Sequence, residues 1–137
     1  DPGWKGRNCN SDIYKEGLEI KIVTTIHGKF ALLICGDLFN ENIIKELKKK
    51  DFDYFIHLLV RHDILNGKKV TAECWEEEFE YSLDQYKLLN CTSFVVNLFG
   101  EDMKENNAFG GAWIISPKGE LLAKKDIYEP GILYYEV

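Results

Sequence analysis

Two apolar segments near the start of the chain predict neighbouring strands. Residues 19–26 alternate between apolar and polar positions and are rich in β-branched side chains, which indicates a half-buried strand. His27 and Gly28 provide a turn into residues 29–35, whose continuous apolar run is typical of a strand buried on both faces. Residues 1–15 contain turn-forming residues without periodicity, so we expect a loop there.

Helical and strand patterns alternate along the rest of the chain. Asn40 is suited to cap a helix over residues 41–50, which has an acidic start and lysines at its end. Residues 71–90 place apolar side chains at steps of three or four, and the glutamates at 76–80 fall mostly on the solvent side of that helix. Further strands are predicted at residues 53–60, 93–98, 112–116, 120–124 and 132–137, with a loop at 106–111. This alternation, which ends in a hairpin, predicts an α/β layered fold without a domain boundary.

The composition is that of one compact domain. The 137 residues are 45% hydrophobic, which is ample for a core, and the net charge of -6 argues against nucleic acid as a partner. The longest apolar run, residues 30–35, is far below the roughly 20 residues that cross a bilayer, so we expect no membrane partner. The first residues lack an initiator Met and a signal-peptide pattern, so a piece of a cytoplasmic protein is expected. The four cysteines have no zinc-ligand spacing, which favours free thiols and no metal.

Cys35 is the residue that most strongly suggests chemistry. It ends the continuous apolar strand and is followed at once by Gly36 and Asp37. In open α/β sheets, ligands bind beyond the carboxyl ends of strands. A small residue after a nucleophile permits a tight turn whose backbone N–H groups face a developing oxyanion. The spacing alone leaves two interpretations: a catalytic thiol in a pocket, or a buried cysteine that acts as a small hydrophobic residue.

Three motifs resemble segments of the nitrilase, or carbon-nitrogen hydrolase, superfamily. Residues 32–39, Leu-Leu-Ile-Cys-Gly-Asp-Leu-Phe, are similar to its nucleophile segment. Residues 94–100, Phe-Val-Val-Asn-Leu-Phe-Gly, look like its strand that runs through Asn to Gly, and residues 110–122 look like its Gly-Gly hairpin. The ending, residues 129–137, is similar to the family's last strand. The resemblance therefore covers about residues 17–137.

This resemblance implies both a fold and a reaction. The fold is the nucleophile-bearing, C-terminal half of a four-layer α-β-β-α sandwich, preceded by a loop at residues 1–16. The reaction is hydrolysis of a carbon–nitrogen bond, of a small amide ahead of a nitrile or an N-carbamoyl compound, by the Cys35 thiolate through a thioester. The Gly36 backbone N–H would donate to the oxyanion, and no cofactor is implied. Asp37 is followed by Leu-Phe-Asn-Glu, without the Arg and Pro that many members carry, so no subfamily is indicated.

The resemblance also implies parts that are absent from this chain. The family's catalytic Glu and Lys lie upstream of the nucleophile, and residues 1–34 contain no segment that matches them. We therefore expect them in a missing N-terminal half, and we expect this chain alone to be inactive. Because family members associate, a homodimer or higher homo-oligomer is expected. The alternative class is a non-catalytic member that binds a ligand or partner.

Other polar residues carry open alternatives. His62 and Asp63 follow a predicted strand, so a Cys35–His62–Asp63 hydrolase of another family is a rival to an ordinary loop histidine. By family resemblance Arg61 lies beside the substrate pocket, where it would hold a substrate carboxylate or else lie at the surface. We interpret Asp37 as structural. We interpret His27 as a turn residue, His57 as strand packing, the glutamates at 76–80 as a solvated face, and Trp113, Tyr134 and Tyr135 as core or interface residues.

Overall fold

The computed structural model describes residues 19–62, 64–65, 68–101 and 107–136, and its centre is a six-stranded mixed sheet. The strand order is β1 (Ile22–Thr25), β2 (Gly28–Ile34), β3 (Tyr54–Leu59), β6 (Thr92–Asn97), β9 (Ala112–Ile115) and β10 (Leu121–Lys125). The strands β2, β3 and β6 run parallel, while β1, β9 and β10 are antiparallel to their neighbours.

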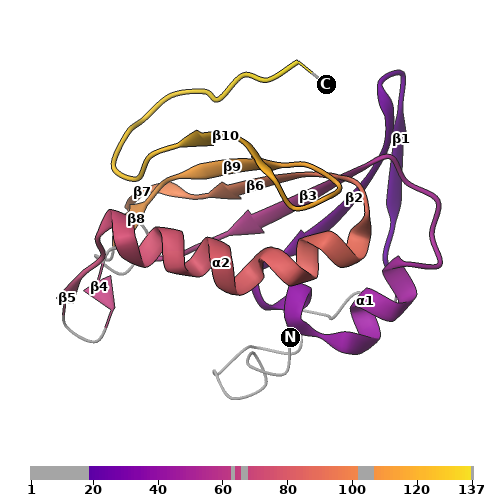
Figure 1. Ribbon diagram of the computed structural model, residues 1–137, viewed down its shortest axis with the longest axis horizontal. Coiled ribbons are helices and arrows are strands. Elements are labelled where there is room, and N and C mark those ends of the chain that lie inside the picture. The colour runs from indigo at the N-terminus through magenta and orange to yellow at the C-terminus, as the bar shows by residue number, and fades with distance from the viewer. Residues whose placement is uncertain (1–18, 63, 66–67, 102–106, 137) are drawn as a thin grey trace, which may run out of the picture.

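Two helices connect the parallel strands and cover one face of the sheet (Figure 1). Helix α1 (Glu41–Leu47) joins β2 to β3, and helix α2 (Ala72–Leu89) joins β3 to β6. Both crossovers step in the same direction across the sheet, and the right-handed rule then puts both helices on the same face. Asn40 caps α1 as predicted, since its side chain accepts hydrogen bonds from two backbone N–H groups at the start of the helix.

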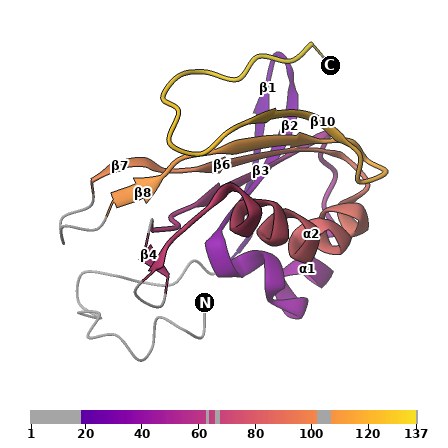
Figure 2. The ribbon, with the colours of Figure 1, turned by 60° about the vertical axis from the view of Figure 1, so that its left-hand side comes forward.

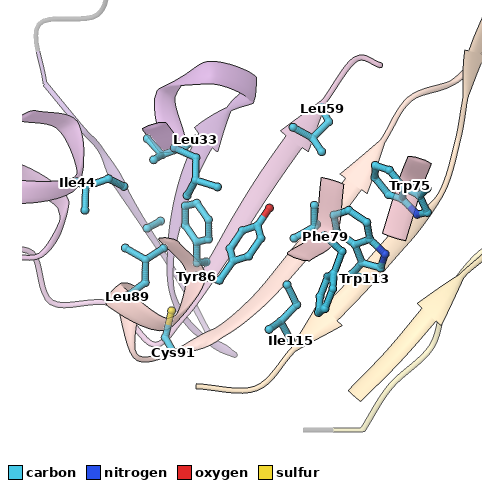
Figure 3. Packing of buried hydrophobic residues seen from close by; sticks show 14 of the residues in the cluster. Leu33, Ile44, Leu59, Trp75, Phe79, Tyr86, Leu89, Cys91, Trp113 and Ile115 are labelled. Carbon is cyan, nitrogen blue, oxygen red and sulfur yellow. The ribbon is translucent and has the colours of Figure 1, made fainter. Parts of the chain in front are cut away.

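The core lies between the helices and this face of the sheet (Figure 3). Trp75 and Phe79 of α2 pack on Trp113 of β9, and the two indole rings stack with their centroids 3.7 Å apart. At the other end of α2, Tyr86 and Leu89 are buried against the parallel strands. The predicted helix at 71–90 and its buried face are therefore confirmed.

The opposite face of the sheet is apolar and largely open. Ile34, Leu58 and Val96 lie side by side on β2, β3 and β6, and they remain 54%, 39% and 45% exposed. The C-terminal segment, residues 126–136, runs along this side, away from the helices (Figures 1 and 2). It leaves these three side chains exposed. The described residues thus form one sheet and one helical layer, the partial α/β sandwich that the sequence predicts.

Several local predictions are wrong. Residues 132–136 are irregular rather than a strand, because no described strand pairs with them and Ile132 and Tyr134 are 72% and 81% exposed. The predicted loop at 106–111 contains β8 (Asn107–Phe109), which pairs with β7 (Phe99–Glu101) as a separate ribbon. A second ribbon, β4 (Ile64–Leu65) with β5 (Lys68–Lys69), is also absent from the sequence prediction. The predicted loop at 1–16 lies outside the described residues.

The lengths of helix α1 and of the first strand differ from the prediction by a few residues. The strand predicted at 19–26 is shorter, and α1 ends at Leu47 rather than at residue 50. Among the described residues, no helix is both long and apolar enough to span a bilayer.

Candidate active site

Cys35 stands at the carboxyl end of β2, where the strand turns into a short 3₁₀ helix, Cys35–Phe39. Its φ angle is 49°, in the left-handed region that a residue with a Cβ rarely adopts. Gly36 is not among the described glycines with positive φ, so the strained residue of the turn is the cysteine itself and not the glycine after it. Such strain, on the order of 1–3 kcal/mol, persists only where the surroundings hold the residue in place.

Asp37 fixes the turn from within. One of its carboxylate oxygens accepts a hydrogen bond from the backbone N–H of Ile34 at 3.2 Å, and its carbonyl oxygen accepts from the N–H of Asn40 at 3.1 Å. These contacts close the turn on both sides of Cys35. Both contacts fit the structural role that the sequence predicts for Asp37.

His57 holds the same turn from the neighbouring strand. Its side chain is 1% exposed in β3, and its Nε2 lies 2.9 Å from the carbonyl oxygen of Cys35. Its Nδ1 lies 2.8 Å from the hydroxyl oxygen of Tyr86 in α2. Burial lowers the pKa of His57, against the opposing effect of the Cys35 carbonyl, and burial raises the pKa of Tyr86. Both side chains are therefore neutral near pH 7.

Sequence reasoning missed this role of His57. The alternation of β3 places His57 on the helix-facing side, which is the only signal for its burial. Its partners are 22 residues earlier and 29 residues later in the sequence, so no local motif links the three residues.

At the end of β6, Asn97 connects three chain segments. Its Oδ1 accepts from the N–H of Arg61 at 2.7 Å, and its Nδ2 donates to the carbonyl oxygen of Gly110 at 2.8 Å. The backbone N–H of Asn97 donates to the carbonyl of Gly111 at 3.0 Å. The buried asparagine thereby connects the ends of β3 and β6 to the start of β9.

Arg61 forms an ion pair with Glu78 of α2, with 2.5 Å between the guanidinium Nη2 and the carboxylate Oε1. The two side chains are 38% and 26% exposed. The Nε atom of Arg61 is buried without a hydrogen-bond partner among the described residues. The assignment of Arg61 to a substrate carboxylate stays a prediction, and a substrate would share this guanidinium with Glu78.

His62 is placed toward the β7–β8 ribbon, where it forms an isolated antiparallel bridge with Ala108. Asp63, the third member of the rival triad, lies outside the described residues. The histidine ring that reaches the main chain of Cys35 belongs to His57, which contacts the carbonyl oxygen and not the sulfur.

The described cysteines differ in their surroundings. Cys35, Cys74 and Cys91 are free thiols, as predicted. Burial raises the pKa of Cys91 to about 11, so this thiol is almost wholly protonated near neutral pH. Cys74 lies in α2 and Cys91 lies just before β6, whereas Cys35 lies at the carboxyl end of a parallel strand. No described group of three or more His, Cys, Asp or Glu residues is placed to hold a metal ion.

The class of protein follows from the family match. Cys35 is half-buried at the carboxyl end of a parallel strand, where the crossover through α1 begins, and this is the edge of an α/β sheet at which ligands bind. The chain belongs to the carbon-nitrogen hydrolase family, whose family model matches residues 4–137. None of the curated protein sequences compared with it matches.

Solved structures share the fold at low sequence identity. The glutamine-dependent NAD⁺ synthetase from Acinetobacter baumannii has a TM-score of 0.70 and 17% identity, over 89% of this chain and 22% of that protein. A carbon-nitrogen hydrolase from Helicobacter pylori has a TM-score of 0.67 and 16% identity, over 85% of this chain and 43% of that one. A variant of an amidase from Nesterenkonia, which carries the acetamide moiety of fluoroacetamide on its active site cysteine, has a TM-score of 0.63 and 13% identity, over 86% and 41%. The chain therefore spans less than half of the length of each of these proteins.

Proposed function

We propose that the complete protein hydrolyses the carbon–nitrogen bond of a small amide, with Cys35 as the nucleophile. The Cys35 thiolate attacks the carbonyl carbon, and the tetrahedral intermediate carries its charge on the former carbonyl oxygen. That intermediate expels the amine, which takes the proton that the base removed from the thiol, and leaves a thioester on Cys35. Water then attacks the thioester, which releases the carboxylic acid and restores the thiol.

The observation that carries this proposal is the strained turn at Cys35. The positive φ angle is maintained by Asp37 within the turn and by His57 from the next strand. A buried cysteine that served only as packing would need no such turn. The Nesterenkonia amidase variant, which carries the acetamide moiety of fluoroacetamide on its active site cysteine, supports a nucleophilic cysteine in this fold.

The backbone N–H of Gly36 is the oxyanion donor that this chain supplies. In the part of the chain that the structure describes, no carboxylate or ammonium group hydrogen-bonds to Cys35. A free thiol is only a few per cent ionised near neutral pH, so the reaction needs a base and a cation close to it. Because residues 1–34 also contain no segment that matches the family's Glu and Lys motifs, we propose that these two residues lie in a part of the complete protein outside this chain.

The exposed face of the sheet is consistent with such a missing part. Ile34, Leu58 and Val96 form an apolar surface one residue away from the nucleophile. A second sheet packed on this face would bury it and would come close to Cys35 from the side opposite to the helices. The homo-oligomer expected from the family remains a prediction.

Turnover by the complete protein tests this function. Purified protein is assayed for ammonia or amine release from a panel of small aliphatic amides, nitriles and N-carbamoyl compounds. Cys35→Ala should lower the turnover rate by several orders of magnitude, whereas the matched variant Cys74→Ala should retain it. Turnover that survives in Cys35→Ala would exclude this residue as the nucleophile. A wild-type protein without any turnover would favour the non-catalytic, binding alternative.

A further inference from the structure

His57 and Tyr86 form a buried hydrogen-bonded pair that ends on the main chain of the nucleophile. Tyr86 is 1% exposed in α2 and His57 is 1% exposed in β3 (Figure 3 shows Tyr86 directed from the helix toward the sheet). The two hydrogen bonds, Tyr86 Oη to His57 Nδ1 and His57 Nε2 to the Cys35 carbonyl oxygen, measure 2.8 and 2.9 Å. These two hydrogen bonds link helix α2 through His57 to the turn that carries Cys35.

The partners determine the direction of each hydrogen bond. A carbonyl oxygen only accepts hydrogen bonds. The Nε2 of His57 therefore carries a hydrogen and donates a hydrogen bond to the carbonyl oxygen of Cys35. In the neutral imidazole the Nδ1 is then an acceptor, and the Tyr86 hydroxyl donates to it. The phenol therefore selects the one neutral tautomer that can bind the Cys35 carbonyl.

The Cys35 carbonyl shares a rigid peptide unit with the N–H of Gly36. Because that unit is planar and trans, its C=O and N–H point in opposite directions. A hydrogen bond that fixes the carbonyl toward His57 therefore also fixes the direction of the Gly36 N–H, away from His57. The left-handed φ of Cys35 confines its ψ to a narrow range, and the hydrogen bond to His57 holds the peptide unit in one direction within that range.

We propose that His57, held in its Nε2–H tautomer by Tyr86, is a positioning residue that aims the Gly36 N–H at the oxyanion. This inference rests on the proposed function, since it needs Cys35 as the nucleophile. An oxyanion donor stabilises the transition state only when its direction is set before the reaction. His57 touches neither the sulfur nor the substrate in this arrangement, and it acts through one peptide plane.

The test compares two reactions of the same sulfur in the complete protein. Acylation by an amide substrate develops an oxyanion, whereas alkylation by iodoethane, which has no carbonyl group, is a displacement at a saturated carbon and develops none. Both rates depend equally on the thiolate and on access to Cys35. A change in the oxyanion donor alone therefore slows acylation and leaves alkylation unchanged.

Four variants make the comparison specific. Tyr86→Phe removes only the hydroxyl donor, His57→Leu removes the ring donors, and His57→Gln retains an N–H donor near the position of Nε2. The matched control is Tyr81→Phe, which removes a hydroxyl from a 72% exposed tyrosine of the same helix. Each variant is checked for a cooperative thermal transition, and Tyr86→Phe decides the question if His57→Leu does not fold.

The expected result is a split between the two rates. Tyr86→Phe and His57→Leu should lower the single-turnover acylation rate by about 10- to 100-fold, somewhat less than the loss of an oxyanion donor itself. Their rates of Cys35 alkylation should stay within about twofold of wild type, while His57→Gln and Tyr81→Phe should acylate within about threefold. Unchanged acylation in both Tyr86→Phe and His57→Leu, or an equal loss of acylation and alkylation, would overturn the inference. A wild-type protein that is alkylated but never acylated would instead overturn the proposed function.

Discussion

The side-chain amide of Asn97 brackets the main chain of Arg61. Its Oδ1 accepts from the Arg61 N–H at 2.7 Å, and its Nδ2 lies 3.4 Å from the Arg61 carbonyl oxygen, to which it donates. Asn97 is 3% exposed, so these backbone groups are satisfied by the asparagine in place of water. The relation fixes where the chain leaves β3, next to the strand that carries the nucleophile.

Replacing Asn97 should therefore destabilise the fold strongly. Asn97→Ala leaves the Arg61 N–H and the Gly110 carbonyl without their side-chain partner, and each unsatisfied buried group costs about 1–3 kcal/mol. We expect the free energy of unfolding in urea to fall by about 2–5 kcal/mol. Asn107→Ala, at an exposed position of the nearby ribbon, should change it by less than about 0.5 kcal/mol. Equal effects of the two substitutions would contradict this account.

Gly111 marks a close approach between β9 and α2. A Cβ at this position would lie 2.8 Å from Cε2 and Nε1 of Trp75, and the φ angle is +96°. Gly100, with φ +139° and no atom within 4 Å of such a Cβ, is the matched control for backbone strain alone. Gly100→Ala should cost about 1–3 kcal/mol, and Gly111→Ala about 1–3 kcal/mol more because the indole must move. Comparable unfolding midpoints for the two variants would contradict this prediction, because they would show that the Trp75 side chain moves without loss of stability.

The buried His57 predicts a dependence of stability on pH. Burial lowers the pKa of His57 in the folded protein, so below about pH 6.5 the unfolded chain takes up a proton that the folded chain does not. The contribution of neutral His57 is fully present above that pH and is lost as the pH falls. Asp37, Arg61 and Glu78 provide the charges around the ring, and their effects oppose one another.

Urea unfolding between pH 7.5 and 5.5 measures this contribution. The free energy of unfolding of the wild type should fall more steeply with acid than that of His57→Gln, by at most about 1.4 kcal/mol per pH unit. His27→Gln, in the exposed turn between β1 and β2, is the control and should keep the slope of the wild type. Parallel slopes for wild type and His57→Gln would show that His57 titrates normally in the folded protein.

The exposed face of the sheet predicts how a charged substitution there changes the stability of the complete protein. If a second sheet covers this face, Leu58→Lys buries a cation there and should lower the free energy of unfolding by about 2–4 kcal/mol. Ile26→Lys, at a 96% exposed position of the β1–β2 turn, is the matched control and should be neutral. Differential scanning calorimetry of the complete protein compares them. A melting temperature of Leu58→Lys equal to that of Ile26→Lys would show that the face stays open.

The sequence predicts those features that a local pattern records. The continuous apolar run at residues 29–35 defines the buried strand, and the abrupt change to Gly36 and Asp37 locates the turn that carries Cys35. The helical spacing of Trp75 and Phe79 defines the core face of α2. Each of these depends on residues that are close together in the chain.

Contacts between distant segments are not recorded in this way. His57 alternates like any inward-facing strand residue, and only the packing of α2 on β3 brings Tyr86 to its ring. The apolar and aromatic run at residues 132–135 resembles a strand, but a strand also needs a partner, and no described strand supplies one. The strained φ of Cys35 likewise follows from hydrogen bonds across the turn and from β3, not from the cysteine itself.

The central claim, that Cys35 is the nucleophile, is tested most directly by the site of the covalent adduct. The complete protein is mixed with a small amide, which leaves a thioester, or with fluoroacetamide, which alkylates the thiolate with loss of fluoride. The protein is then quenched in acid and digested, and its cysteine peptides are compared by mass spectrometry. We predict an adduct on the peptide that contains Cys35, absent in Cys35→Ala and undiminished in Cys74→Ala. An adduct on another cysteine, or substrate turnover in Cys35→Ala with no adduct at this position, would contradict the account.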